Sequence, residues 1–272
     1  MNESLVTDEV ISVSFDEGIQ KAKTKIERDS SKLQVDGFKG ASRALFLARL
    51  IQSTARAMVV LTPNQNTGET LIGDLKYFYK FNNIKSVPRF FPTWELLPYE
   101  NLSPASEIMG ERLEILNLIQ RNEVPLLVVP VEAIMQCVMP RRELSSQTFT
   151  IIKGETFERE FLETCLFDNG FARIPMVENR GEFSVRGDII DIYPPASSDP
   201  LRIEFFDNRI ESIREFDISS QVSLKVIERL EILPVREVSP TSGQKEAGLE
   251  KISQLAREYG ADPARVKELT DK

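Results

Sequence analysis

The sequence predicts a mixed α/β protein in two parts, a parallel-sheet α/β domain and a smaller α+β domain. Up to about residue 148, continuous apolar runs such as Ala57–Thr62 and Leu126–Val129 alternate with segments of helical periodicity. Strands that are buried on both faces of a parallel sheet have such runs. Beyond Pro140, short alternating strands separated by Gly, Pro, Asn and Asp follow one another, most clearly in residues 181–217. That pattern is typical of an antiparallel meander.

In the first part, we expect helices where apolar residues recur three and four positions apart, and strands where they run together. The expected helices are residues 14–29, 41–52, 66–81 and 107–120, with another through Ile134, Met135 and Val138. The expected strands are residues 33–35, 57–62, 87–91 and 126–129. The strand at 57–62 should be buried on both faces, because all of its central residues are apolar.

In the second part, strands dominate and one helix accompanies them. The expected strands are residues 149–152, 182–186, 188–193, 201–206 and 209–216, with further strand pattern at 222–233. The accompanying helix is expected at Glu158–Asn169. Residues 238–243 are polar and predict a linker, after which Gln244–Tyr259 has the periodicity of a last helix.

Composition limits the possible functions. The chain has 272 residues, a net charge of -8 and no histidine. An acidic balance argues against nucleic acid as the main ligand, and the lack of histidine removes the usual general base and the commonest metal ligand. No apolar run approaches the roughly 20 residues that span a bilayer. The first ten residues lack the features of a signal peptide. We therefore expect a cytoplasmic protein with no membrane partner.

The two cysteines, Cys137 and Cys165, are far apart in the sequence and lie among apolar residues. Zinc sites in proteins need about four clustered ligands, which two isolated cysteines cannot supply. Free cysteines commonly behave as small buried hydrophobic residues. We expect that role for both, and we expect no metal and no cofactor.

Residues 37–44 lie where a phosphate-binding loop would open a helix, but they depart from its pattern. The functional pattern is G-x-x-x-x-G-K-[ST]. Gly37 fits the first position, whereas Ser42, Arg43 and Ala44 replace the second glycine, the lysine and the magnesium-binding hydroxyl. The segment is therefore either a non-functional phosphate loop or an ordinary helix start, and nucleotide hydrolysis is disfavoured.

Within the meander, Arg186 and Arg202 lie in strands beside residues that should face the core, and Phe205 and Phe206 are adjacent. Because side chains alternate across a strand, Phe205 should join Ile203 in the core. Phe206 should then lie on the face of Arg202. The arginines either pair with cross-strand acids such as Glu204 or Asp188, or form a protein-docking face with Phe206.

Three stretches resemble the bacterial transcription-repair coupling factor family, the Mfd proteins. They are FPTWELLPYE at 91–100 with Glu111-Arg112-Leu113, VVPVEAIMQCVMP at 128–140, and Gly181-Glu182-Phe183 with RGD at 186–188 and RIEFFD at 202–207. The last is similar to a domain that this family shares with the excision-repair protein UvrB. UvrB also has an intact phosphate loop and a tyrosine-rich hairpin. This chain has five tyrosines, none of them clustered at such an insertion, and it therefore resembles Mfd more than UvrB.

The resemblance implies a UvrB-like module with four segments. Residues 1–36 would be an N-terminal segment packing with the return segment, and residues 37–148 a degenerate RecA-like, helicase-type domain 1a. Residues 149–234 would be the inserted UvrA-binding domain 2, and residues 235–272 a linker and the start of the return domain 1b. The chain would then be an N-terminal fragment without the motor and polymerase-binding domains.

The resemblance also implies a function, the non-catalytic recruitment of UvrA, which links stalled RNA polymerase to nucleotide excision repair. The UvrA-contacting residues of the family fall on Arg186, Arg202 and Phe206. The full-length family protein is an ATP-dependent DNA translocase. It contacts RNA polymerase and DNA through other domains and masks the UvrA-binding face with its own C-terminal domain.

Two alternatives stay open at this stage. One is a UvrB-like, ATP-dependent DNA repair protein, against which the Ser42-Arg43-Ala44 departure counts. The other is a direct DNA-binding module that uses Lys39, Arg43 and Arg89. Contacts to phosphate would make its affinity fall steeply with salt concentration.

Overall fold

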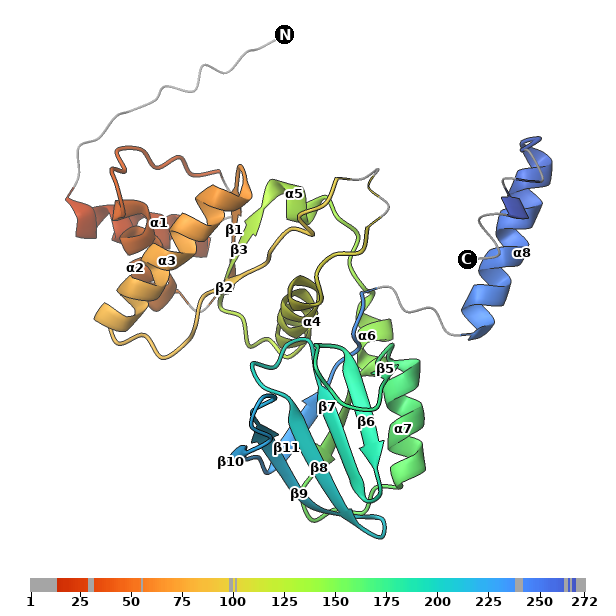
Figure 1. Ribbon diagram of the computed structural model, residues 1–272. Helices are drawn as coiled ribbons and strands as arrows, with labels where there is room; N and C mark the ends of the chain where they lie inside the picture. Colours follow the sequence, from red (N-terminus) through yellow and green to blue (C-terminus); the bar gives the residue numbers. More distant parts are fainter. Residues whose placement is uncertain are drawn as a thin grey trace. The chain divides into compact units, whose positions relative to one another are not determined.

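The computed structural model describes residues 14–28, 32–54, 56–97, 100, 102–237, 242–261, 264, 266 and 267 (Figure 1). Two compact units divide the chain, the first within residues 1–100 and 115–137 and the second within residues 101–114 and 138–272. The chain passes between them inside helix α4, Ser106–Gln120. Both parallel and antiparallel sheets are present, which confirms the mixed α/β class.

Unit 1 is an α/β layer. Its strands are β1 (Met58–Thr62), β2 (Arg89–Phe90) and β3 (Leu126–Pro130), and its helices besides part of α4 are α1 (Phe15–Arg28), α2 (Ser42–Ser53), α3 (Gln65–Phe81) and α5 (Val131–Ile134). The described sheet has the order β1-β3-β2 with parallel pairing throughout, as predicted. Every residue of the central strand β3 is buried.

Helices α2 and α3 cover one face of this sheet, and α1 covers α2. Ala44 and Ala48 of α2 pack with Leu75 of α3 and Val128 of β3, and all four are fully buried. Small residues on α2 let the helix approach the sheet closely. Asn64 is the N-cap of helix α3. Its side chain accepts a hydrogen bond from the backbone N–H of Thr67 at 2.9 Å, the usual way to satisfy a free helical donor.

Three expectations for unit 1 are wrong. Strand β1 is not buried on both faces, because Val59 and Leu61 are 63% and 54% exposed on the face that α2 and α3 do not cover. Residues 33–35 form no strand, and Leu33 and Val35 are exposed. The helix expected through Val138 stops at Ile134, and a separate helix, α6 (Arg141–Gln147), begins after Pro140. Apolar periodicity predicts regular structure only where a core receives the apolar side chains.

Unit 2 contains the predicted meander. Its strands are β4 (Phe149–Ile152), β5 (Ala172–Arg173), β6 (Glu182–Arg186), β7 (Ile189–Tyr193), β8 (Leu201–Phe206), β9 (Arg209–Phe216), β10 (Ser223–Val226) and β11 (Arg229–Ile232), and its helices are α6, α7 (Arg159–Asp168) and α8 (Ser242–Glu258). The larger sheet has the order β10-β9-β8-β7-β6-β5, with all pairs antiparallel except β5–β6. The strand pattern expected at 222–233 divides into β10 and β11, and β11 pairs with β4 instead.

One face of the large sheet carries the core of unit 2. Phe183, Ile190 and Ile203 pack there against Leu162 and Leu166 of α7, all of them at most 1% exposed. Burying each such side chain contributes about 1.5–3 kcal/mol. Because this face alone anchors the sheet to α7, the opposite face of the sheet is free to carry polar side chains.

A buried ion pair joins the part of α4 in unit 2 to the segment that follows β11 in the same unit. Arg112 donates from Nε to Oε1 of Glu237, and from Nη2 to Oε2 at 3.3 Å. The two side chains are 0% and 1% exposed. Two donors facing two carboxylate oxygens compensate for the loss of water around both charges.

Removing one partner of this pair should destabilise the protein strongly. We expect Arg112→Ala to lower the free energy of unfolding by about 3–5 kcal/mol, because it leaves the Glu237 carboxylate buried and lacking this partner. Urea unfolding measures the loss. The control is Lys153→Ala, whose partner Glu228 lies at 2.8 Å on the surface and whose removal should cost less than about 1 kcal/mol. Equal losses for the two variants would contradict this interpretation of the buried pair.

Gly110 of α4 allows a close backbone contact that no other residue permits. A Cβ atom at this position would lie 2.4 Å from the Pro195 carbonyl carbon, whereas one at Gly73 of α3 would meet nothing within 4 Å. We expect Gly110→Ala to lower the melting temperature. Gly73 is at an exposed position of α3, so Gly73→Ala should stabilise the helix by roughly 0.5–1 kcal/mol. Calorimetry of both variants tests the contact, and a stable Gly110→Ala protein would show that it is absent.

Candidate protein-docking face

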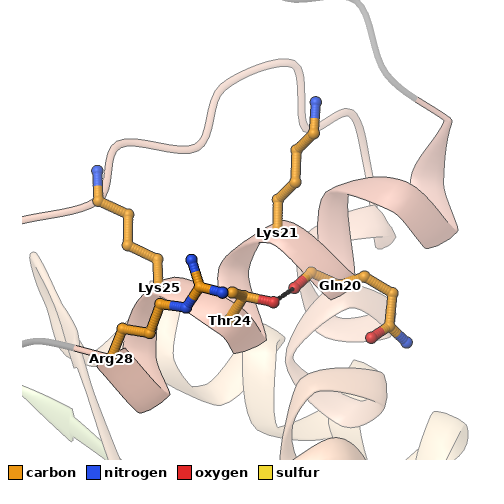
Figure 2. Close-up of a pocket in the computed structure, with 5 residues that line it drawn as sticks. All are labelled: Gln20, Lys21, Thr24, Lys25 and Arg28. Carbon is orange, nitrogen blue, oxygen red and sulfur yellow. Dashed lines mark hydrogen bonds between the residues drawn. The ribbon is translucent and has the colours of Figure 1, made fainter.

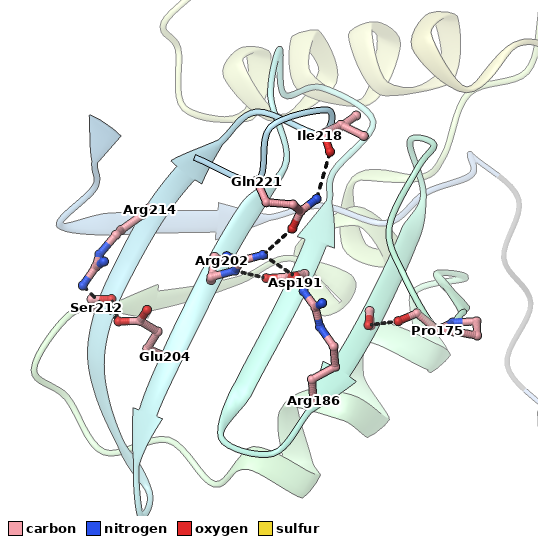
Figure 3. A network of polar contacts seen from close by, with 10 residues as sticks. Pro175, Arg186, Asp191, Arg202, Glu204, Ser212, Arg214, Ile218 and Gln221 are labelled. Atoms are coloured by element: carbon pink, nitrogen blue, oxygen red, sulfur yellow. Dashed lines mark hydrogen bonds and ion pairs between the residues drawn. The ribbon is translucent and has the colours of Figure 1, made fainter. Parts of the chain in front are cut away.

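The face of the large sheet that points away from α7 gathers the polar residues of the meander, and we call it the outward face (Figure 3). Strand pairing arranges it in rows, since paired side chains lie on the same side of a sheet. The first row is Ser184, Asp191, Arg202 and Arg214, and the second row is Arg186, Ile189, Glu204 and Ser212. Phe206 and Arg209 follow as a third row on β8 and β9.

Asp191 is the centre of the outward face. It lies on β7 between the strands that carry the two arginines, and its side chain is 2% exposed. Arg202 reaches it with two hydrogen bonds, from Nε to Oδ1 at 2.7 Å and from Nη2 to Oδ2 at 3.0 Å. Arg186 donates from Nη2 to the same Oδ2. A buried carboxylate is thus held by two guanidinium groups, the arrangement that offsets the cost of burying its charge.

Three neighbouring side chains contact the guanidinium group of Arg202. Besides Asp191, its Nη2 donates to Oε1 of Gln221 at 2.8 Å, and its guanidinium lies over the Phe216 ring at 4.5 Å. Gln221 is itself fixed by a hydrogen bond from Nε2 to the Ile218 carbonyl. The hydrogen bonds to Asp191 raise the pKa of Arg202 above its usual value. Its side chain is 15% exposed, so little of this arginine reaches the surface.

Arg186 and Phe206 are the accessible members of the predicted site. The Arg186 side chain is 46% exposed, and Phe206 is 70% exposed. Phe205, its neighbour, is 4% exposed in the core beside Ile203. The predicted division of the Phe205–Phe206 pair is therefore confirmed. The alternation in β8 persists even though its ladder with β9 is irregular between Glu204 and Phe205.

The acids suggested as partners of the two arginines have other partners instead. Glu204 accepts hydrogen bonds from Ser212 Oγ at 2.6 Å and from Arg214 Nη2 at 3.0 Å. Asp188 lies 3.5 Å from Arg159. Asp191 is the true partner, and the sequence analysis missed it. The Gly187-Asp188 turn would have placed Asp191 on the face of Arg186, but its pairing with Arg202 depends on the loop before β8.

The segment resembling a phosphate loop starts α2 as an ordinary helix does. The Ser42 hydroxyl accepts a hydrogen bond from the backbone N–H of Lys39 at 2.8 Å, and Gly37 and Gly40 have positive φ angles of 90° and 52°. A pocket of about 410 Å³ lies nearby, lined by Phe38, Gly40, Arg43, Ala44, Asn66, Thr67, Thr70, Leu71 and Asp74. It includes Arg43 but neither Lys39 nor Arg89. One backbone donor near the start of the helix is thus taken by the chain's own side chain.

A second hollow, of about 390 Å³, lies along α1 and has a basic lining. Its residues are Gln20, Lys21, Thr24, Lys25 and Arg28 (Figure 2). Thr24 donates to the Gln20 carbonyl at 2.9 Å, whereas Lys21 and Lys25 extend away from the helix. Cations at helical spacing are typical of a solvated helix face, so this hollow has no feature that selects a ligand.

The cysteines differ from the expectation of burial. Cys137 is exposed and Cys165 is half-buried. Cys137 follows the short helix α5, and the apolar residues beside it are exposed and do not pack into a core. Within the described residues, no group of three His, Cys, Asp or Glu side chains is placed to hold a metal ion. Among the same residues, no helix is long and apolar enough to cross a membrane.

Comparison with known proteins supports the resemblance. Residues 149–238 match the UvrB interaction domain family. The chain is 34% identical to the transcription-repair-coupling factor of Myxococcus xanthus over 214 residues, which are 78% of this chain and 18% of that protein. The Bacillus subtilis factor is 32% identical over 79% of this chain and 18% of its own length. The Escherichia coli factor is 31% identical over 73% and 17%.

The chain therefore carries a UvrB-homology module that contains a UvrB interaction domain. Within that class it is similar, over most of its length, to transcription-repair-coupling factors, as the resemblance predicts. It spans less than a fifth of the length of the relatives named above. The outward face, with Arg186, Asp191, Arg202 and Phe206, lies within the matched domain.

The two thiols should react at different rates. Burial, with a smaller effect of Asp168, raises the pKa of the Cys165 thiol, so less thiolate is present at pH 8. We expect Ellman's reagent to label exposed Cys137 first and Cys165 slowly. Replacing Cys137 by serine should remove the fast phase. Loss of the slow phase in that variant would contradict the assignment.

Proposed function

We propose that this chain recruits UvrA through the outward face of its UvrB interaction domain. One observation carries the proposal. An accessible cation, Arg186, and a 70% exposed phenylalanine, Phe206, lie on the same face of the domain that matches this family. Arginine and aromatic residues are enriched where protein interfaces gain most of their binding energy. A monomer gains little from a phenylalanine in water, whereas a partner would bury it.

The charge of the outward face supports a protein partner with acidic groups. Its paired groups are the cations Arg186, Arg202 and Arg214 and the acids Asp191 and Glu204, so three positive charges face two negative ones. This local excess lies on a chain whose net charge is -8. Arg186 also uses one of its nitrogens toward Asp191 and has no other partner in the described part of the chain. A partner carboxylate could accept from the remaining donors.

We further propose that the module does no catalysis and that residues 37–148 form a degenerate RecA-like domain 1a. The parallel order β1-β3-β2 with flanking helices is compatible with such a domain. Ser42, Arg43 and Ala44 lack the groups that hold nucleotide and magnesium, and the Ser42 hydroxyl instead accepts a hydrogen bond from the Lys39 backbone N–H just before the helix. In the whole protein, other domains would supply DNA translocation and RNA polymerase binding, and UvrA recruitment would link these activities to excision repair.

Direct DNA binding has less support. Lys39 lies just before α2, Arg43 in its first turn and Arg89 in β2, and the pocket that Arg43 lines also contains the acid Asp74. A DNA-binding module would also need a broadly basic surface. Titration with duplex DNA at low salt distinguishes the two functions, because phosphate-driven binding would be strong there and would weaken steeply as salt is added.

The proposal predicts that UvrA binding depends on the outward face. In a calorimetric titration, Arg186→Ala combined with Phe206→Ala should raise the Kd by roughly a hundredfold, since each truncation at an interface centre costs about 1–2 kcal/mol. Urea unfolding of the double variant should still be cooperative, because Phe206 is exposed and Arg202 still pairs with the buried Asp191.

The matched control removes the same two residue types from the other side of the domain. Phe167 on α7 is 70% exposed, as Phe206 is, and the Arg173 side chain is 60% exposed. We expect Arg173→Ala with Phe167→Ala to bind UvrA as the unchanged chain does. Equal affinities for the two double variants would exclude the outward face as the binding site.

A further inference from the structure

We propose that Asp191 is a positioning residue of the outward face, and that Arg202 supports Arg186 through Asp191. The inference rests on the proposed recruitment of UvrA and assigns different roles to residues of the same site. Arg186, Ile189 and Phe206 would then form the contact patch, above a buried layer made of Asp191, Arg202 and Gln221.

The first step is the enclosure of Arg202. Its Nε and Nη2 are engaged by Asp191, Nη2 also by Gln221, and one side of its guanidinium plane is covered by Phe216. These contacts engage Nε and Nη2 and fix the guanidinium against Asp191, while 15% of the side chain stays exposed. Arg202 therefore holds the Asp191 carboxylate in one place.

The second step concerns Arg186, which is bound to Asp191 and still exposed. It shares Oδ2 of Asp191 with Arg202, yet 46% of its side chain remains exposed. A free arginine samples many rotamers and loses that freedom on binding. Because Asp191 is buried and fixed by Arg202, it holds the Arg186 guanidinium in one orientation before any partner arrives. Such preorganisation lowers the entropic cost of docking.

The third step is the geometry of the contact patch. Arg186 pairs with Ile189, which pairs with Glu204, and Phe206 follows one row further along β8. With strands about 4.8 Å apart and a rise of about 3.3 Å per residue, the Cα atoms of Arg186 and Phe206 are roughly 12 Å apart. Half-buried Ile189 lies between them. The patch therefore fits a partner that offers one carboxylate beside an apolar hollow large enough for a phenyl ring.

The Asp191→Asn variant distinguishes two possible effects on UvrA affinity, the positioning of Arg186 and the net charge of the outward face. The substitution keeps the side-chain size and one acceptor oxygen, but it removes a negative charge from the outward face. If charge alone governed docking to an acidic partner, UvrA binding would stay the same or become tighter. If Asp191 positions Arg186, binding should weaken, and we expect the Kd to rise roughly tenfold. Unchanged or tighter binding would overturn the inference.

UvrA binding is measured for two further variants. Glu228→Gln makes the same change in charge outside the outward face, where Glu228 pairs with Lys153, and should leave the Kd within about twofold. Asp191→Asn added to Arg186→Ala should weaken binding no further than Arg186→Ala does, because coupled residues are not additive. Fully additive losses would mean that Asp191 does not act through Arg186.

A readout on the chain alone separates failure of this inference from failure of the proposed function. Phenylglyoxal, followed by mass spectrometry, should modify Arg186 faster than Arg202, and Asp191→Asn should speed the modification of both. Unchanged rates in that variant would overturn the positioning role whether or not UvrA binds. Absence of UvrA binding by the unchanged chain, with these rate changes present, would instead reject the proposed partner.

If Asp191→Asn does not fold, Arg186→Lys on the exposed surface gives the same test. It keeps the charge but lacks the planar fork that a carboxylate can orient. The positioning role predicts a loss of UvrA affinity close to that of Arg186→Ala. Full affinity in the lysine variant would mean that charge alone suffices, and the inference would be wrong.

Discussion

Alternation along the strands of the large sheet is the constraint on which the docking face depends. One face must be apolar to pack against α7, so every second residue of β6, β7 and β8 is committed to the core. The remaining residues are collected on the opposite face, in rows set by the strand register. A stable core and a polar binding surface therefore arise from the same short strands, and Phe205 and Phe206 illustrate the division between them.

A charged outward face creates a second requirement, because a carboxylate at the centre of a sheet loses most of its water. Asp191 meets this requirement with two arginines from the strands on either side of it. The pairing is unequal, since Arg202 is enclosed and Arg186 remains accessible. In our proposal the two arginines have different roles. The enclosed Arg202 stabilises the Asp191 carboxylate, and the accessible Arg186 contacts UvrA.

The rest of the described chain supplies stability and attachment more than chemistry. Arg112 and Glu237 form a buried ion pair that ties α4 to the end of the UvrB interaction domain, and Gly110 lets the helix approach Pro195 closely. In unit 1, the Ser42 hydroxyl at the start of α2 accepts a hydrogen bond from the backbone N–H of Lys39. These features are consistent with a module that relies on contacts with a partner and not on bound nucleotide.

The sequence by itself determined the class of the fold, the meander and the division of Phe205 from Phe206, because these depend on local periodicity and turns. It also supplied the motifs that identify the family. Only the tertiary structure decided that Asp191 joins Arg186 and Arg202, because that contact needs the register of β7 against β8 across the loop at 194–200. Tertiary structure likewise decided that Val59, Leu61 and Cys137 are exposed. An apolar run predicts burial only if another element covers it, and no local pattern specifies which one does.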